Sequence, residues 1–338
     1  MGKERSFVRK RKRGCLSGCL TRLILLLGLA AVLLVGACVL GFVKIDQETG
    51  APMLSLESVG LGGVSLGGFS LESVSLPRVS LPQLALPGWA YSLNSAGLTV
   101  KTLRAGDGEA VLVCSDGYTM LLGAGPGLGL MTSAQLLLCG VNHLNVAVAM
   151  SAENGQIAGM STVLSLMKPD YLIYQNSQTK NEAYNRMLQK AQGIDGLMGL
   201  VPQQGQTFSL GRATVTFVGP TRTNHIDERD DGLSVRIDYG ETSLLVMGTV
   251  TAAGEMEMAT SRANLDVDAI ICARGGSDAA TGAEIVQAAS PSIALLTGKA
   301  PANSVRVRLE RAGAQIYAAS DHGVMTLVSD GQTIRVEP

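Results

Sequence analysis

Histidine is scarce in this chain, which carries only His143, His225 and His322 among 338 residues. Histidine is the side chain that proteins use most for zinc and for acid–base chemistry near neutral pH. His143 precedes an apolar strand pattern, and we interpret it as a partly buried structural residue. His322 lies in a Ser-Asp-His-Gly turn, which is typical of the surface. Histidine-dependent catalysis is therefore disfavoured.

Cysteine pairs with metal-ligand spacing are also missing. The chain has 6 Cys and no CxxC motif, and Cys114, Cys139 and Cys272 each stand alone in an apolar run. Such residues are typical of buried free thiols. The Gly-x-Ser-x-Gly elbow and the phosphate-binding Walker loop are absent as well, which excludes two common catalytic designs.

Basic residues become sparse after the first segment. The formal net charge is -1, but about nine of the 27 Lys and Arg lie before residue 45, opposed there by Glu4. The remainder has roughly 18 basic and 27 acidic residues, a net charge near -9. Because nucleic-acid affinity comes largely from Lys and Arg, the acidic body is a poor candidate for binding DNA or RNA.

A long apolar run is present near the start. Leu23–Val43 contains about 21 residues without a charge, enough to cross a hydrocarbon layer of roughly 30 Å. The basic residues 1–22 precede it, which predicts a single-pass transmembrane helix with a cytoplasmic N-terminus and an exported body. The alternative is a cleaved lipoprotein-type signal ending before Cys38.

Residues 44–96 form a low-complexity segment rich in Leu, Ser, Gly and Pro. Pro77, Pro82 and Pro87 recur along it and would interrupt any strand ladder. We interpret it as an extended stalk, with a small β-repeat layer packed on the following domain as the alternative. Trp89 is interpreted as a packing residue between the stalk and that domain.

Residues 97–338 alternate strand and helix patterns in two halves. The predicted strands lie at 98–103, 109–114, 118–123, 145–150, 213–219, 233–240, 242–248, 268–273 and 293–298, with closing strands up to 338. The predicted helices lie at 162–167, 181–192, 254–260, 283–289 and 305–313. Hairpins interleaved with crossover helices predict a four-layer αββα sandwich rather than one doubly wound sheet.

Seven segments, in this order, resemble the metallo-β-lactamase-like domain of ComEC-type competence proteins. They are Arg104–Ala110 (family VGQGDA), Leu121–Gly127 (LIDAGPG), Val148–Met160 (VLTHPDADHIGGL), Asp231–Ile237 (after NDNS), Leu245–Thr249 (LLTGD), Ile271–Ser277 (VPHHGS) and Leu309–Tyr317 (the final helix and strand). The resemblance implies the metallo-β-lactamase fold over almost all of residues 98–336. It also implies a site of clustered His and Asp that holds zinc and activates a water.

The ligand positions of that site are replaced here. The replacements are Gly123 for the turn Asp, Ser151 for the first His, Glu153 and Gly155 at the Asp positions, Gln156 for the second His, Thr249 for the bridging Asp, and Arg274 and Gly275 for the paired His. The late GHPS segment has become Lys299–Ser304. Glu153 keeps a carboxylate, but Arg274 places a cation where zinc would lie. The resemblance therefore implies a degenerate, metal-free site.

A further acidic run follows His225, up to Asp231. It lacks the ligand spacing of a calcium loop, and we interpret it as a solvated acidic loop. A rebuilt metal site from Glu153, Asp107, Asp230 and Asp231 is the alternative that would preserve hydrolysis.

These observations predict a membrane-anchored, catalytically inactive protein that acts by binding or assembly at the cell surface. Its expected partners are the bilayer, through Leu23–Val43, and an unidentified protein or small molecule, with no metal, no cofactor and no nucleic acid. The alternatives are a phosphodiesterase- or nuclease-like hydrolase with the rebuilt metal site, and an accessory of DNA uptake. The acidic body disfavours the last of these.

Overall fold

The computed structural model describes residues 43–45, 52–54, 97–104, 109–177 and 181–337. The chain divides into two units, 1–82 and 83–338. In the first unit, the described residues pair as a short antiparallel sheet of β1 (Val43–Ile45) and β2 (Pro52–Leu54). Val43, the last residue of the apolar run, thus begins a strand, while Leu23 and the rest of that run lie outside the described residues. No helix among the described residues is long and apolar enough to cross a membrane.

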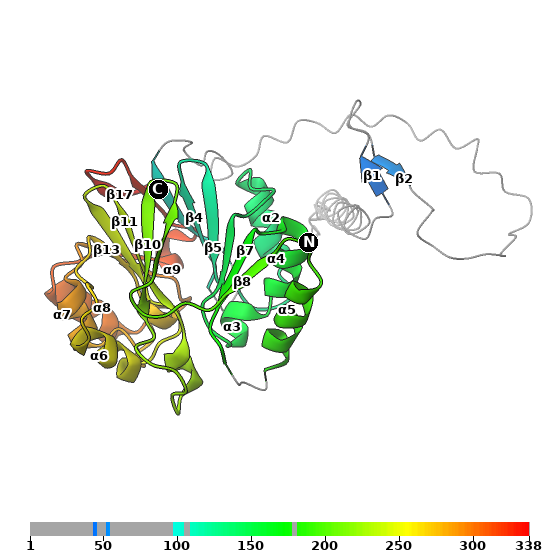
Figure 1. The fold of residues 1–338 in the computed structure, drawn as a ribbon. Coiled ribbons are helices and arrows are strands. Elements are labelled where there is room, and N and C mark those ends of the chain that lie inside the picture. The colour runs from blue at the N-terminus through cyan, green and yellow to red at the C-terminus, as the bar shows by residue number, and fades with distance from the viewer. Residues whose placement is uncertain (1–42, 46–51, 55–96, 105–108, 178–180, 338) are drawn as a thin grey trace, which may run out of the picture. The chain divides into compact units, whose positions relative to one another are not determined.

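The second unit contains two mixed sheets (Figure 1). The eight-stranded sheet has the order β17-β16-β3-β4-β5-β6-β7-β8. Its strands are β3 (Leu98–Thr102), β4 (Val111–Ser115), β5 (Tyr118–Leu122), β6 (Val146–Ala149), β7 (Tyr171–Tyr174), β8 (Met198–Leu200), β16 (Thr326–Ser329) and β17 (Ile334–Glu337). The strands from β17 to β5 are antiparallel neighbours, and those from β5 to β8 are parallel.

The seven-stranded sheet repeats this plan in the order β15-β14-β13-β12-β11-β10-β9. Its strands are β9 (Thr207–Leu210), β10 (Ala213–Gly219), β11 (Ser234–Tyr239), β12 (Thr242–Val246), β13 (Ala269–Ile271), β14 (Ile293–Leu296) and β15 (Gln315–Ala318). Antiparallel hairpins join β9 to β12, and β12 to β15 run parallel. Parallel neighbours require crossovers, and helices supply them here.

Helices flank the two sheets on their outer faces (Figure 1). The first half has α2 (Leu130–Leu138), α3 (Asn154–Ile157), α4 (Met160–Met167) and α5 (Glu182–Gln192). The second half has α6 (Ala252–Thr260), α7 (Ala283–Ala289), α8 (Asn303–Arg311), α9 (Ala319–His322), and the short 3₁₀ helices η3 (Glu228–Asp231) and η4 (Ala273–Gly275). The architecture confirms the predicted mixed α/β sandwich.

Three apolar clusters separate the four layers. One lies between the sheets, where alternate strand residues such as Val113 and Val235 meet. A second fills the space under α2 to α5, around Leu112 and Leu164, and a third lies under α6 to α8, around Leu245 and Leu309. Cys114 and Cys272 are buried free thiols within these clusters, as predicted, and Cys139 is a partly buried one.

Helix α2, which the sequence did not predict, reverses the usual burial. It exposes Leu130, Met131 and Leu137, and buries Thr132 and Gln135. The Thr132 hydroxyl donates to the Ala124 carbonyl at 2.9 Å. The Gln135 amide accepts from the Arg104 backbone N–H at 2.8 Å and donates to the Arg104 carbonyl at 2.7 Å. These buried polar side chains therefore hold two loops that lead toward the same edge of the sandwich.

Candidate binding cleft

The parallel strands of both sheets end at one edge of the sandwich, and the positions that the resemblance assigns to a metal site follow them there. Gly123 comes after β5, Ser151 after β6, Thr249 after β12 and Arg274 after β13. Backbone hydrogen bonds join these ends, from Gly123 N–H to the Val148 carbonyl at 2.9 Å and from Arg274 N–H to the Gly248 carbonyl at 2.8 Å. Ligand sites in open α/β sheets lie at this kind of edge. The structure thus places the predicted positions along one edge of the sandwich, and we refer to this candidate site as the cleft.

Glu109 is the carboxylate that lies at the centre of this edge, and the sequence analysis gave it no role. Its Oε2 accepts from Gln156 Nε2 at 2.7 Å, and its Oε1 accepts from the Thr297 hydroxyl at 2.6 Å. Thr297 follows β14 and Gln156 lies in α3, so this carboxylate links the two halves of the sandwich. Burial raises the pKa of the Glu109 carboxyl, while these hydrogen bonds and the positive charge of Arg274 oppose the rise.

A sequence signal for Glu109 was present. It occupies the acidic position in the Arg104–Ala110 segment that resembles the family's opening turn. Residues 105–108, which lie between Arg104 and Glu109 and include Asp107, are outside the described part of the chain. A carboxylate within the Arg104–Ala110 segment, directly before an apolar strand, could have been assigned to the cleft.

Gly123 stands where the family has its turn Asp, and the structure leaves no room there for a side chain. Its φ is +70°, and a Cβ built on it would lie 2.6 Å from the Glu109 carbonyl oxygen and 2.4 Å from Gln156 Oε1. Both distances are shorter than real contacts. The turn is therefore adapted to glycine and to the Glu109–Gln156 pair together.

Arg274 has an unusual backbone and an unusual side-chain environment. Its φ of 52° and ψ of 33° lie in the left-handed region, which L side chains rarely adopt. Its Nε and Nη1 atoms are buried and have no hydrogen-bond partner in the described part of the chain. Nη1 lies 3.6 Å from Glu153 Oε2, an ion-pair distance that is too long for a hydrogen bond. The guanidinium, at a position where the resemblance implies a metal ligand, is thus buried for the most part and incompletely bonded.

The remaining predicted positions support the cleft wall. The Ser151 hydroxyl is buried and accepts from the Glu153 backbone N–H at 3.2 Å. The Gly155 carbonyl accepts from the Glu109 N–H at 3.2 Å, and Gly275 accepts from the Gly298 N–H at 3.0 Å. Thr249 is 4% exposed, with its hydroxyl 3.4 Å from the Arg229 carbonyl. These groups hold neighbouring backbone rather than project freely into the cleft.

The carboxylates of the alternative rebuilt metal site are engaged elsewhere. Both oxygens of Asp230 accept from the Thr251 hydroxyl, at 2.8 and 3.0 Å, and Asp231 accepts from His225. Glu153 pairs with Arg274, and Asp107 lies outside the described residues. Across the described ranges, no group of three or more His, Cys, Asp or Glu is arranged to hold a metal ion.

The run from His225 to Asp231 is not the solvated loop that its composition suggested. His225 has a side chain only 5% exposed, held between Asp231 and Glu257. Its Nδ1 lies 2.7 Å from Asp231 Oδ1 and its Nε2 lies 3.0 Å from Glu257 Oε2. Arg222 and Thr221 also donate to Glu257. The prediction was wrong for His225 and Asp231, because Glu257 of α6, 32 residues further along the chain than His225, covers them, whereas Glu228 is exposed as expected.

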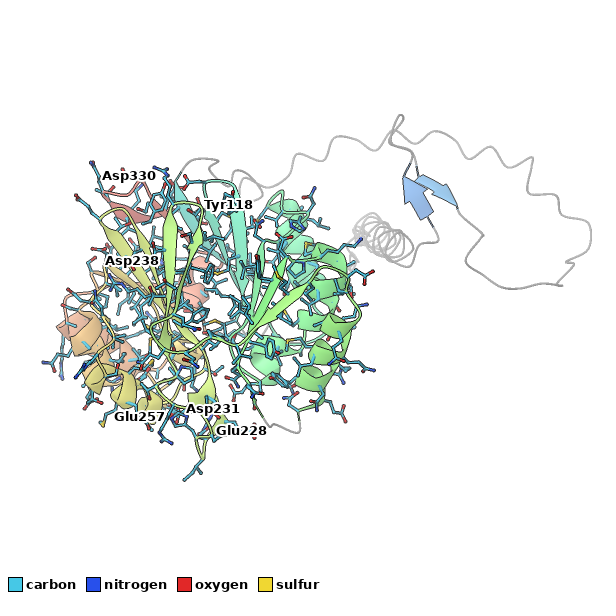
Figure 2. All side chains as sticks on the ribbon, in the orientation of Figure 1. Tyr118, Glu228, Asp231, Asp238, Glu257 and Asp330 are labelled. Carbon is cyan, nitrogen blue, oxygen red and sulfur yellow. The ribbon has the colours of Figure 1, made fainter. Side chains whose placement is uncertain are left out.

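Figure 2 shows Asp231 and Glu257 at the lower end of the molecule, with Tyr118 and Asp330 at the opposite end. We name the residues Thr221, Arg222, His225, Asp231 and Glu257 the α6 cluster.

The other two histidines are exposed. His143, predicted to be partly buried, has a side chain 48% exposed that pairs with Asp170 at 3.2 Å, so that prediction was also wrong. His322 ends α9 at the surface, as expected.

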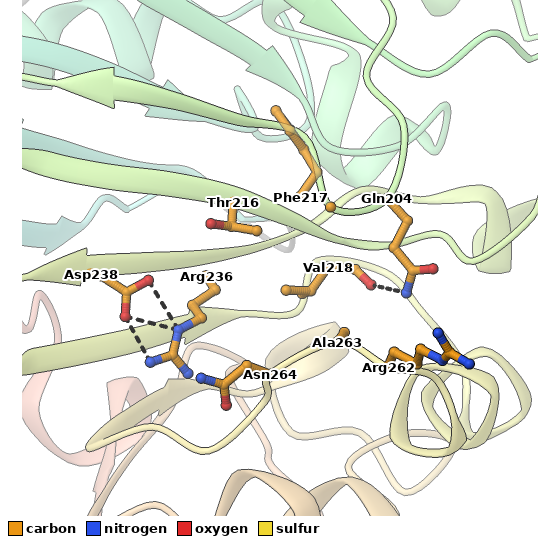
Figure 3. A pocket seen from close by; sticks show the side chains of 10 residues that line it. Gln204, Thr216, Phe217, Val218, Arg236, Asp238, Arg262, Ala263 and Asn264 are labelled. Atoms are coloured by element: carbon orange, nitrogen blue, oxygen red, sulfur yellow. Dashed lines mark hydrogen bonds and ion pairs between the residues drawn. The ribbon is translucent and has the colours of Figure 1, made fainter.

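A separate hollow of about 470 Å³ lies on the outer face of β10 and β11 (Figure 3). Its polar walls are largely engaged within the protein. Arg236 pairs with Asp238 at 2.7 Å, and Gln204 donates to the Val218 carbonyl at 3.0 Å and to Ser261. Arg262, at the rim, is exposed. The hollow therefore offers few directed groups to a ligand.

No family model matches the sequence, and no curated protein matches it. Solved structures with the metallo-β-lactamase fold are similar to it at low identity. The fold protein YhfI from Bacillus subtilis is 14% identical, over 65% of this chain and 96% of that chain, with a TM-score of 0.45. A metallo hydrolase from the archaeon Ignicoccus hospitalis is 15% identical, over 71% and 99%, with a TM-score of 0.44.

A third similar structure, a metal-dependent hydrolase of the β-lactamase superfamily, is 9% identical over 65% of this chain and 95% of that chain, with a TM-score of 0.46. Likenesses of this size do not establish a family, a metal or an activity for this chain. Its functional interpretation depends on its own topology and on the residues at the cleft.

Proposed function

We propose that this chain is a membrane-anchored protein of metallo-β-lactamase type that has lost catalysis and acts by binding at the cell surface. The donor set of the cleft carries the proposal. Zinc sites in this kind of fold need several His and carboxylate ligands with free lone pairs. Here Glu109 already accepts from Gln156 and Thr297, and Arg274 brings a positive charge. These residues do not fit the metal centre that the resemblance implies, so we derive no step through a metal.

Without such a centre, the cleft has no means of generating a hydroxide near neutral pH. The Ser151 hydroxyl does not replace it, since it is 1% exposed and no histidine accepts its proton in the described structure. What remains is an edge with a partly buried carboxylate and an incompletely bonded cation, which is suited to holding a ligand.

The membrane anchor is proposed from the sequence. A run of about 21 apolar residues, Leu23–Val43, follows a basic segment, which favours a cytoplasmic N-terminus and an exported domain. Protease added to intact cells should cut after Lys44 while a cytosolic control protein stays intact. Protection of that region in intact cells, and its digestion after lysis, would show the opposite orientation.

Elemental analysis tests the loss of catalysis. The full chain, purified in detergent with an affinity tag free of histidine and without chelator, should contain no stoichiometric transition metal. Phosphodiesterase and β-lactam assays should show no turnover that EDTA removes. The matched variant Glu109→Gln, which removes the buried carboxylate, should change neither result. About one equivalent of metal in the native chain, lost in the variant together with turnover, would establish the hydrolase instead.

A further inference from the structure

We propose that the cleft binds a compact oxyanion, the carboxylate or phosphate group of a small ligand, on the guanidinium of Arg274. The proposal rests on the binding role proposed above and names the chemistry of its ligand. It depends on four features of Arg274: its unused donors, the contrast with neighbouring arginines, its backbone conformation and its place in the cleft.

Arg274 has hydrogen-bond donors that no group of the described residues uses. A guanidinium offers five N–H donors, and a planar oxyanion can accept two of them side by side. Nε and Nη1 of Arg274 have no hydrogen-bond partner, although both atoms are buried. A buried donor without an acceptor is costly, and proteins keep few of them. The side chain as a whole is 23% exposed, so its other atoms contact solvent, and a ligand reaches the two buried donors by displacing a neighbouring group.

Two other arginines near this end of the molecule are bonded within the protein. Arg229 donates from Nε to Asp227 Oδ1 at 2.7 Å, and its Nη2 contacts Asp227 Oδ2. Arg222 donates from Nη2 to Glu257 Oε1 at 2.8 Å and from Nε to Glu257 Oε2 at 3.2 Å. Both therefore form two-point pairs with a carboxylate. Glu153 could pair with Arg274 in the same way, yet it stays 3.6 Å away and its side chain is 41% exposed.

Arg274 is held in a backbone conformation that is unfavourable for a residue with a long side chain. Left-handed φ and ψ at a residue with a long side chain cost of order 1 kcal/mol, and such strain persists where the surroundings impose it. Here the Arg274 N–H donates to the Gly248 carbonyl at 2.8 Å, and the next residue, Gly275, packs against Gly298. The strand ends thus fix the direction in which the guanidinium leaves the backbone.

The position of Arg274 beside Glu153 limits the affinity for a ligand. Glu109 lies in the same cleft, but its oxygens are engaged by Gln156 and Thr297, so among the described residues Glu153 is the carboxylate that pairs with the guanidinium. An entering oxyanion has to displace Glu153, so we expect weak affinity, on the order of 1 mM for a free anion. The ligand's remaining atoms would have to supply further affinity.

Thermal unfolding of the full chain in detergent tests the proposal, with sodium phosphate and sodium acetate as probes at constant ionic strength. At about ten times the dissociation constant, either probe should raise the melting temperature by roughly 3–6 °C over sodium chloride. Arg274→Gln should abolish the rise. Arg335→Gln, which removes the same charge from an exposed arginine on β17, should keep it.

Two further variants keep the test sharp if Arg274→Gln folds poorly. Arg274→Lys keeps the charge without the planar fork and should reduce the rise. Glu153→Gln removes the competing carboxylate and should lower the dissociation constant several-fold. An equal rise in Arg274→Gln and in the native chain, or no rise in the native chain and in Glu153→Gln, would overturn the oxyanion site. If the protein contains no metal and binds neither anion, the oxyanion site is overturned but the proposed loss of catalysis still holds.

Discussion

The cleft and the α6 cluster are two polar assemblies in one domain, and they differ in how completely their groups are bonded. In the α6 cluster, His225 uses both ring nitrogens, and Glu257 accepts from three side chains. In the cleft, Arg274 leaves buried donors unused. A fully bonded network stabilises the fold, whereas buried donors without a partner are rare in folded proteins and indicate a candidate site for a ligand. Substitutions in the two assemblies should therefore affect stability in opposite ways.

The largest loss of stability is expected from Glu255→Ala, beside the α6 cluster. Glu255 is 1% exposed, and its carboxylate accepts from the Thr281 and Gly282 backbone N–H groups at 2.6 and 2.7 Å. The truncation leaves two buried donors unpaired, which should cost roughly 3 kcal/mol of unfolding free energy in urea. A cost below about 1 kcal/mol would mean that water reaches these groups, and that the hydrogen bonds near α6 contribute less to stability than we expect.

The same residue gives stability a pH dependence. Burial raises the pKa of the Glu255 carboxyl from 4.5 to about 7. The folded state therefore keeps a proton that the unfolded state has released, and the contribution of Glu255 to stability should fall as pH rises from about 4.5 to 7. Urea unfolding across this range should show the decline, and Glu255→Gln should flatten it. An unchanged slope in the variant would assign the decline to other groups.

A smaller loss is expected from His225→Gln. Because carboxylates only accept, an imidazole that bonds to Asp231 and Glu257 at once must carry both protons. Burial lowers the pKa of His225, but hydrogen bonds to Glu257 and Asp231 outweigh it, and the pKa is raised. The charged form is thus favoured by folding. The stabilisation, about 1.5 kcal/mol, should be complete below pH of about 6.5 and disappear as pH rises through the folded pKa.

The difference in unfolding free energy between the native chain and His225→Gln, measured at several pH values, checks this expectation. A difference that grows toward high pH would show that His225 is neutral in the folded state. The α6 cluster would then carry an uncompensated carboxylate, and the contrast with the cleft would weaken.

In the cleft, Arg274→Gln should leave stability unchanged or raise it by up to about 1 kcal/mol. The substitution removes a buried, incompletely bonded cation together with its desolvation cost. Urea unfolding without phosphate or carboxylate buffers measures the effect. A loss above about 2 kcal/mol would show that Arg274 is part of the structural framework, as the α6 cluster is.

The smallest effect is expected within the α6 cluster, from Arg222→Gln. Arg222 forms a two-point pair with Glu257, but its side chain is 59% exposed, and exposed ion pairs contribute little. We expect no resolvable change in the melting temperature. A clear loss would show that the pair is needed to orient Glu257 toward His225, and would extend the structural network to the surface.

Much of the fold was predictable because its signals are local. The strands at Val111–Ser115 and Thr242–Val246 are short apolar runs between turn residues, and α5 has the spacing of an amphipathic helix. Helix α2 escaped because Thr132 and Gln135 are buried for their hydrogen bonds rather than for apolar character. Leu136 is the apolar residue on the buried face of α2, and an amphipathic pattern does not reveal a helix whose buried face is otherwise polar.

The cleft was predictable from ordered motifs, but its bonding was not. The positions of Ser151, Thr249 and Arg274 at strand ends followed from the resemblance. The hydrogen bond of Glu109 to Thr297 joins residues 188 positions apart, and that of His225 to Glu257 joins residues 32 apart. Contacts of this kind depend on how the two sheets are registered, which spacing along the chain does not encode.

The crowding at Gly123 makes this turn hard to substitute. A Cβ at the position would lie 2.6 Å from the Glu109 carbonyl oxygen and 2.4 Å from Gln156 Oε1. An aspartate introduced there would strain the turn and disturb the hydrogen bond between Gln156 and Glu109 before it could act as a ligand. A metal site could be built at this edge only by changing the turn and its neighbours together, so single substitutions should alter what the site binds rather than add a metal.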